Sequence, residues 1–266
     1  MKKTKTIHLV ILVLLMTGFI SEAQQEKMPV TSISGNAVNF YYEATGAMEN
    51  AEFARGEMLL NEALKKDPEF FMGLFQLALN NLYLGNHAKF KKYAEAAFIS
   101  NCAYSEGEKI LQEALKRLYE NPKADATHLG RKLIRLYPED KLVYYPQLTF
   151  QTFTNDYAGI RETCNSLLKI TDNPAPVHNM LGYNYMQLND FETAEKAFDK
   201  YIELEPNHPN PYDSKGDFYM AVKDYPNAYA SYMTANRLDN SWSYEKMMEA
   251  KKLMETEAVS KTKKNK

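Results

Sequence analysis

The 266-residue sequence has only two cysteines and one tryptophan, and it lacks the short motifs of the common enzyme classes. No His-Glu-x-x-His, Gly-x-Ser-x-Gly or Cys-x-x-Cys sequence occurs, and no glycine-rich phosphate loop is present. The five histidines are spread along the chain rather than grouped at the spacing of metal ligands. We therefore expect a protein that is not an enzyme and that carries no metal or other cofactor.

An excess of basic residues is also missing. The sequence has 32 Lys and Arg against 34 Asp and Glu. Without residues 1–23 the balance is 29 against 33, and residues 261–266 hold four of the remaining lysines and no acid, so the body carries a charge of about −8. Binding to phosphates requires a basic surface. This charge therefore argues against a nucleic acid as partner.

A long hydrophobic run occurs only at the N-terminus. Lys2, Lys3 and Lys5 precede a nearly unbroken apolar run over residues 7–20, and Ser21-Glu22-Ala23 then places small residues where a signal peptidase cleaves. This pattern predicts a signal peptide over residues 1–23, cleaved near Ala23. The alternative is a membrane anchor, but a run of about 14 residues is short for a bilayer that requires about 20. We expect an exported bacterial protein, periplasmic or secreted, with no stable membrane span after cleavage.

A fixed interval of 34 residues dominates the C-terminal half. Three Asp–aromatic pairs recur at this interval: Asp156-Tyr157, Asp190-Phe191 and Asp224-Tyr225. Further positions repeat in the same register: Gly182 with Gly216, Ala194 with Ala228, and Phe198 with Tyr232. A helical pattern within a 34-residue period predicts stacked pairs of helices.

Extending this register backwards divides most of the chain into six units. Their predicted starts are near residues 37, 71, 107, 141, 175 and 209, with a two-residue slip at Ser105-Glu106. The predicted array covers residues 37–242 and follows a polar linker over residues 24–36. Tyr244, Met247 and Met248 then recur at helical spacing, which predicts a capping helix over residues 243–257. Residues 258–266 are interpreted as a disordered basic tail.

The repeated residues resemble the signature of the tetratricopeptide repeat family. The match is formed by Leu181-Gly182, Tyr185, Phe191, Ala194, Phe198 and Pro206, and again by Gly216, Tyr219, Tyr225, Ala228, Tyr232 and Ala235. The resemblance implies an all-α fold, a right-handed superhelical solenoid of about six helix pairs with a C-terminal capping helix. Some positions depart from the family pattern: Ala114 and Leu148 replace the small glycine, Tyr201 replaces a small alanine, and Lys215 occupies an apolar position.

Cys102 and Cys164 are the only candidates for a disulfide. An oxidising compartment favours pairing. However, the two residues fall at different positions of the second and fourth units. Neighbouring helices lie about 8–10 Å apart, whereas a disulfide requires Cβ atoms about 4 Å apart. We expect two free, buried thiols.

The sequence offers one candidate nucleophile pair, Cys164 with either His178 or His128. In the repeat register Cys164 corresponds to Phe198 and Tyr232, which are packing positions. His178 likewise falls where large core residues stand elsewhere in the array. We therefore interpret both as structural residues.

The resemblance also indicates where a partner binds, because the inner faces of the first helices line the concave groove in this family. The candidate groove residues are Phe75, Tyr83, Tyr119, Tyr145, Phe153, Asn179, Tyr183, Asp213 and Asp217. The groove would be aromatic toward its N-terminal end and acidic toward its C-terminal end. Asp213 and Asp217 share a helix face, which suits either a basic partner or a solvated helix start. The aromatic residues suit either recognition or packing between helices.

Two functions are consistent with these features. The first is a non-enzymatic protein–protein interaction scaffold of the bacterial cell envelope, which binds a protein or peptide segment in the concave groove. The alternative is a carrier or sensor of a small ligand or glycan, which would use the groove aromatics as stacking surfaces.

Overall fold

The computed structural model describes residues 27–100 and 103–264, and over these residues it contains helices and no strand. The predicted signal peptide and Cys102 lie outside the described residues. Six helix pairs follow one another: α1 (Gly35–Glu49) and α2 (Phe53–Lys66), α3 (Phe71–Tyr83) and α4 (His87–Ile99), α5 (Glu106–Glu120) and α6 (Thr127–Leu136), α7 (Tyr144–Phe153) and α8 (Tyr157–Leu167), α9 (Ala175–Gln187) and α10 (Phe191–Leu204), α11 (Pro209–Ala221) and α12 (Tyr225–Leu238). The predicted all-α repeat fold is confirmed.

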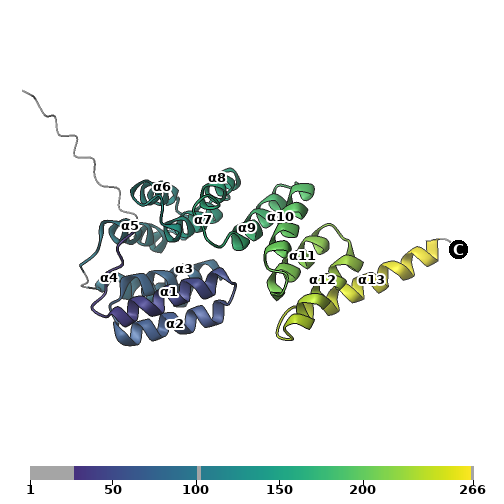
Figure 1. Ribbon diagram of the computed structural model, residues 1–266, viewed down its shortest axis with the longest axis horizontal. Coiled ribbons are helices and arrows are strands. Elements are labelled where there is room, and N and C mark those ends of the chain that lie inside the picture. The colour runs from purple at the N-terminus through teal and green to yellow at the C-terminus, as the bar shows by residue number, and fades with distance from the viewer. Residues whose placement is uncertain (1–26, 101–102, 265–266) are drawn as a thin grey trace, which may run out of the picture.

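The first helix of each pair begins at residue 35, 71, 106, 144, 175 or 209. The predicted unit starts are residues 37, 71, 107, 141, 175 and 209. In the fourth unit a short 3-10 helix, η1 (Lys141–Val143), fills the three-residue difference. A final helix, α13 (Tyr244–Lys264), follows the sixth pair and projects from the end of the array (Figure 1).

The Asp of each repeated Asp–aromatic pair caps a second helix. Its carboxylate accepts a hydrogen bond from the backbone N–H three residues later: Asp156 from Gly159, Asp190 from Thr193, and Asp224 from Asn227. The residue before each Asp has a left-handed backbone, with φ of 55° at Asn155, 57° at Asn189 and 62° at Lys223. Capping of this kind stabilises a helix by about 1 kcal/mol. The pairs are therefore turn and capping residues.

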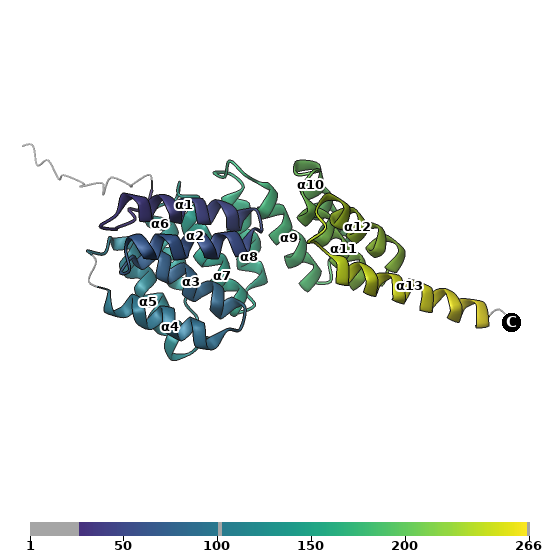
Figure 2. The ribbon, with the colours of Figure 1, turned by 90° about the horizontal axis from the view of Figure 1, so that it is seen from below.

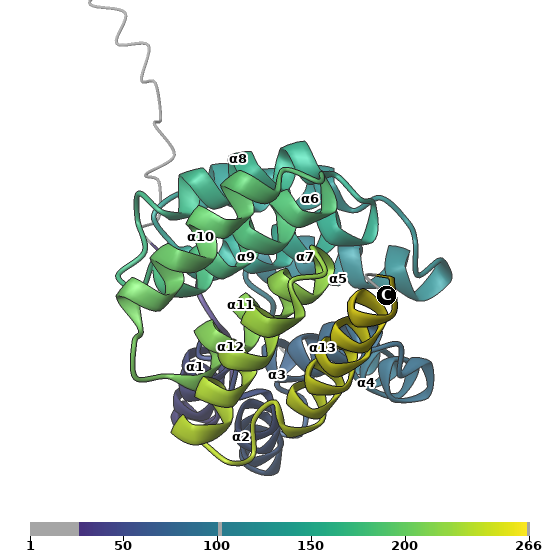
Figure 3. The same cartoon turned by 90° about the vertical axis from the view of Figure 1, so that its right-hand side faces the viewer.

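The array curves enough for its first unit to contact its fourth unit. The Lys141 ammonium of η1 lies 3.1 Å from the Glu49 carboxylate at the end of α1. Asn173, between α8 and α9, donates a hydrogen bond of 3.4 Å to Asn50. From the C-terminal end, α1–α4 lie on one side and α5–α10 on the other, with α11–α13 nearest the viewer (Figure 3).

Residues 27–34 of the predicted linker are bound to the array, and we call them the N-terminal strap; the last two residues of that linker, Gly35 and Asn36, already belong to α1. Three buried carboxylates hold the strap. Asp140 accepts a hydrogen bond from the Met28 N–H (2.9 Å), and Glu108 accepts two from Thr31, one from its N–H (2.9 Å) and one from its hydroxyl (2.7 Å). Asp67 accepts hydrogen bonds from the Ser32 hydroxyl (2.5 Å) and the Ile33 N–H (3.1 Å). Asp67 follows α2 of the first unit, Glu108 lies in α5 of the third unit, and Asp140 directly precedes η1 of the fourth unit. The strap therefore links the first unit to the third and fourth units.

Helix α13 is longer than the predicted cap. It continues through Lys264, whereas the sequence interpretation placed a disordered tail from residue 258. Residues 244–264 contain no glycine or proline to stop a helix. Ala250 is fully buried against Ala228 and Tyr232, so the N-terminal half of α13 covers the last pair as a cap (Figure 2). None of the described helices combines the length and apolarity needed to cross a bilayer.

Candidate ligand-binding chamber

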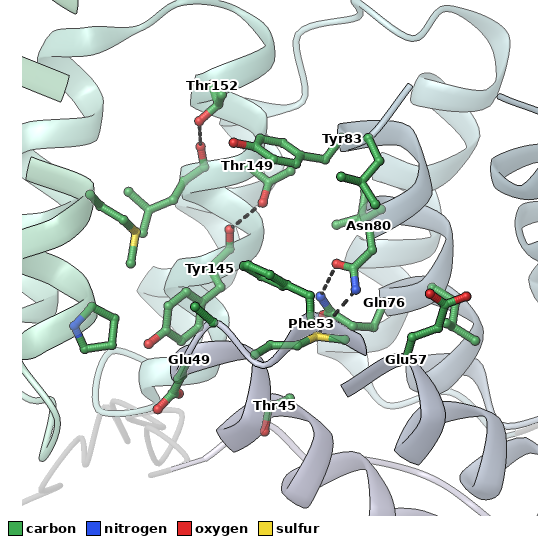
Figure 4. A pocket seen from close by; sticks show the side chains of 18 of the residues that line it. Thr45, Glu49, Phe53, Glu57, Gln76, Asn80, Tyr83, Tyr145, Thr149 and Thr152 are labelled. Carbon is green, nitrogen blue, oxygen red and sulfur yellow. Dashed lines mark hydrogen bonds between the residues drawn. The ribbon is translucent and has the colours of Figure 1, made fainter. Parts of the chain in front are cut away.

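The concave side of the array contains a cavity of about 610 Å³, which we call the chamber. Its walls come from the first helices of four units, α1 and α3 on one side and α7 and α9 on the other, with the start of α2 (Figure 4). The curvature that brings the first unit against the fourth creates it. Small-molecule and peptide-anchor sites have volumes of about 300–1,000 Å³.

Three aromatic side chains define the interior of the chamber. Phe53 is 64% exposed and Tyr83 is 65% exposed, and both rings face the cavity, with the more buried Tyr145 beside them (Figure 4). Burial raises the pKa of Tyr145, and the nearby Glu49 carboxylate raises it further. Tyr145 therefore stays a neutral phenol at physiological pH.

The charged side chains in the lining are two carboxylates, Glu49 and Glu57, and no Lys, Arg or His belongs to it. Glu49 is largely buried and pairs with Lys141, which also contacts Asp172 at 2.8 Å. Glu57 is more exposed and lies 3.5 Å from the exposed Lys89. An exposed pair at this distance contributes little, so Glu57 remains available to a ligand.

Several polar groups of the lining present hydrogen-bond acceptors, and the buried Tyr145 hydroxyl, which has no partner among the described residues, can donate or accept. Three threonine hydroxyls donate to carbonyls of their own helices: Thr45 to Tyr42 (2.9 Å), Thr149 to Tyr145 (3.0 Å) and Thr152 to Leu148 (2.8 Å). Each hydroxyl then offers only lone pairs to the chamber. The Asn179 side-chain oxygen is buried and has no hydrogen-bond partner among the described residues.

The structure brings three of the predicted groove residues, Tyr83, Tyr145 and Asn179, together in the chamber. Phe75 is fully buried in the core and does not reach the groove. Phe153 is half-buried against the same core. Tyr119 lies outside the chamber lining, where its hydroxyl donates to Glu95 and its ring packs on Phe98.

The three remaining predicted residues form a separate cluster beneath α13. The Lys246 ammonium of α13 lies 2.8 Å from Asp213 and 2.9 Å from Asp217. Asp217 also accepts hydrogen bonds from the hydroxyls of Tyr183 (2.9 Å) and Tyr232 (2.7 Å). The acidic end of the groove is therefore occupied by a lysine of the same chain.

Sequence reasoning did not select Phe53, Glu49 or Glu57. The signal for Phe53 was available, because it occupies in the first unit the position of Tyr157, Phe191 and Tyr225 in later units. Those three rings are half-buried, whereas Phe53 is exposed. Phe53 belongs to the terminal unit, which has no preceding unit to pack against.

The candidate catalytic residues are structural. Cys164 is a free, fully buried thiol, and burial raises its pKa to about 12, so it is not a nucleophile at neutral pH. Burial lowers the pKa of the half-buried His178, and the nearby Lys200 lowers it further. Within the described residues, no group of three or more His, Cys, Asp or Glu side chains is placed to hold a metal ion.

Comparison with known proteins agrees with this fold. A family model of the tetratricopeptide repeat matches residues 175–208, one complete unit. A tetratricopeptide repeat protein from Parabacteroides merdae is 14% identical, with a TM-score of 0.51, over 82% of this chain and 84% of its own. None of the curated proteins matches the sequence.

Two MamA structures are also similar over 64% of this chain. MamA MSR-1 C2 is 16% identical with a TM-score of 0.42 and 97% of its own chain covered. A second MamA crystal structure is 14% identical with a TM-score of 0.43 and 92% covered. Of the three structures, the Parabacteroides protein alone exceeds a TM-score of 0.5, and at its identity it supports the fold.

The helix pairs, the capped turns and the concave chamber define an all-α helical-repeat protein. Residues 175–208 match the tetratricopeptide repeat, and the described chain shares the fold of a solved tetratricopeptide repeat protein. This fold supports a protein-interaction scaffold in general and is typically non-enzymatic.

Proposed function

We propose that this protein is an interaction scaffold of the bacterial cell envelope that binds a segment of a partner protein in the chamber. The observation that carries the proposal is the chamber itself, whose lining contains two exposed aromatic rings, Phe53 and Tyr83, and an unpartnered buried acceptor on Asn179. Exposed aromatic residues beside a pocket are typical anchors of recognition. The envelope location rests on the predicted signal peptide and requires cell fractionation to test it.

The binding site is tested with a library of extended peptides. Phe53→Ala and Tyr83→Ala should each weaken selected peptides about tenfold, which is roughly 1.4 kcal/mol. Fluorescence anisotropy with labelled peptides gives the affinities, and circular dichroism checks that the array stays folded. Tyr244→Ala is the matched control, since Tyr244 is 60% exposed but lies on α13, outside the chamber lining. Equal binding by all three variants would rule out the chamber as the site.

A second candidate function is a carrier or sensor of a small ligand or glycan. The specific observation in its favour is the cavity volume of about 610 Å³, which suits a small molecule as well as a peptide anchor. A glycan panel tested against the same variants separates the two functions. Glycan binding that depends on Phe53 and Tyr83, without any peptide binding, would favour the carrier.

A further inference from the structure

The chamber lining carries charge of one sign, from Glu49 and Glu57, together with several hydrogen-bond acceptors. The three threonine hydroxyls and the Asn179 oxygen present acceptors, because the hydroxyl protons are used within their own helices. Glu57 adds a carboxylate whose own partner, Lys89, is exposed and 3.5 Å away. A ligand that complements this lining brings donors and positive charge.

The aromatic rings favour the same kind of ligand. A cation over the face of a Phe or Tyr ring gains about 0.5–2 kcal/mol, depending on how far it is desolvated. Phe53 and Tyr83 leave ring surface uncovered inside the cavity, and Tyr145 adds a third ring (Figure 4). Carboxylates and ring faces thus surround one space.

The same chain already uses this combination for two of its own lysines. Lys215 is 4% exposed, pairs with Glu195 and Asp199, and lies 5.1 Å from the ring centre of Phe218. Lys246 likewise pairs with Asp213 and Asp217 and lies 5.7 Å from the ring centre of Tyr232. The chamber repeats the carboxylates and rings, but its lining contains no cation of its own.

We propose that the chamber holds an arginine side chain of the bound segment; this inference rests on the proposed function. A guanidinium group carries five N–H donors and no acceptor, which fits the threonine and Asn179 oxygens and the Glu57 carboxylate of the lining. Its planar face stacks on aromatic rings, and its weak hydration favours entry into a partly buried site. A neutral sugar gains nothing from the two carboxylates of the lining, and an acidic side chain is repelled by them.

The test uses two small probes, Nα-acetyl-arginine N-methylamide and the corresponding citrulline compound, which has nearly the same shape but no charge. The ¹³C-methyl signals of Met48 and Met180, both in the chamber lining, report binding by NMR, and Met233 on α12 is the distant reference. The arginine compound should shift the two chamber signals and leave Met233 unchanged. The citrulline compound should bind at least tenfold more weakly.

A matched pair of variants tests whether the Glu57 carboxylate is the group that binds the arginine compound. Glu57→Gln should weaken the arginine compound about threefold to tenfold, whereas Glu52→Gln, near the start of the same helix but outside the lining, should leave it unchanged. Equal affinity for arginine and citrulline, or no shift of the chamber signals, overturns the inference.

The peptide library, titrated in the same assay, distinguishes this inference from the proposed function. Peptides without arginine that shift Met48 and Met180 as strongly as arginine peptides overturn the arginine site and leave peptide binding intact. If no peptide shifts either signal, both proposals fail.

Discussion

A glycine opposite an aromatic ring sets the spacing of the two helices in the last two complete units. At Gly182 an added Cβ atom would lie 2.6 Å from Phe198 Cε1, and Gly216 has the same relation to the Tyr232 ring. Both rings are almost fully buried, so neither can move aside without disturbing the core. The glycine is required here for close approach, since no positive φ is involved.

Gly182→Ala should therefore lower the free energy of unfolding by about 1–3 kcal/mol, because overpacking outweighs the gain in helix propensity. Gly46→Ala is the control, since Gly46 lies inside α1 with nothing within 4 Å of an added Cβ. That change should raise stability by about 0.5–1 kcal/mol. Urea unfolding followed by circular dichroism measures both, and a stabilised Gly182→Ala protein would contradict the packing argument.

Two of the positions at which the sequence departs from the family pattern, Lys215 and Tyr201, are explained by their local partners. Lys215, in an apolar position, is buried between Glu195 and Asp199. Tyr201, in the place of a small alanine, accepts a hydrogen bond of 2.8 Å from Asn210. The sequence identified both departures, but their partners lie on neighbouring helices, so the compensation was visible only in the structure.

At the scale of the element, α13 is held to the array by a small apolar cluster around Ala250 and by polar contacts near its N-terminus. Ala250 is its one described residue that is fully buried. Lys246 reaches both Asp213 and Asp217, and the Ser243 hydroxyl donates to Asp213 just before the helix. The sequence placed a cap at this point and an acidic pair on α11 but did not connect them, because nothing in the repeat register relates α13 to α11.

Lys246→Met should loosen this cap. Removal of the Lys246 ammonium leaves the Asp213 and Asp217 carboxylates without their cation. We expect this to reduce the free energy that holds α13 to the array by about 1–2 kcal/mol. Hydrogen exchange of the α13 amides should then become roughly tenfold faster, since the helix opens more often. Lys252→Met, at an exposed position of the same helix, should leave the exchange rates unchanged. Equal rates in both variants would show that the ion pair does not hold α13.

At the scale of the whole molecule, the period of 34 residues predicted the helix pairs but not the closure of the array. Each unit packs chiefly on its neighbours, so its sequence specifies local stacking. The curvature is a sum of small rotations over several units. The contact between Glu49 and Lys141, 92 residues apart, therefore has no sequence signature, and neither has the chamber that this contact encloses.

This closure predicts a loss of stability at alkaline pH. Tyr145 lies at the seam between the first and fourth units, and burial raises its pKa, with Glu49 raising it further. Burial lowers the pKa of Lys141, but its hydrogen bonds to Asp172 and Glu49 more than offset this, and the pKa is raised on balance. In the unfolded chain both groups lose their protons near pH 10. Above that pH the unfolded state binds fewer protons than the folded state, so the free energy of unfolding falls as pH rises.

Tyr145→Phe tests how much of this loss of stability comes from the contact between the first and fourth units. The variant retains the ring but has no phenol to titrate, so its free energy of unfolding should decline less steeply between pH 9 and pH 11 than that of the unaltered protein. Part of the decline remains in this variant, because the pKa values of other buried tyrosines, among them Tyr41 and Tyr232, are also raised. Tyr244→Phe changes an exposed phenol and should leave the slope as it is. Urea unfolding across this pH range measures how steeply the free energy of unfolding declines. An identical decline in the Tyr145→Phe protein would show that Tyr145 does not contribute to it.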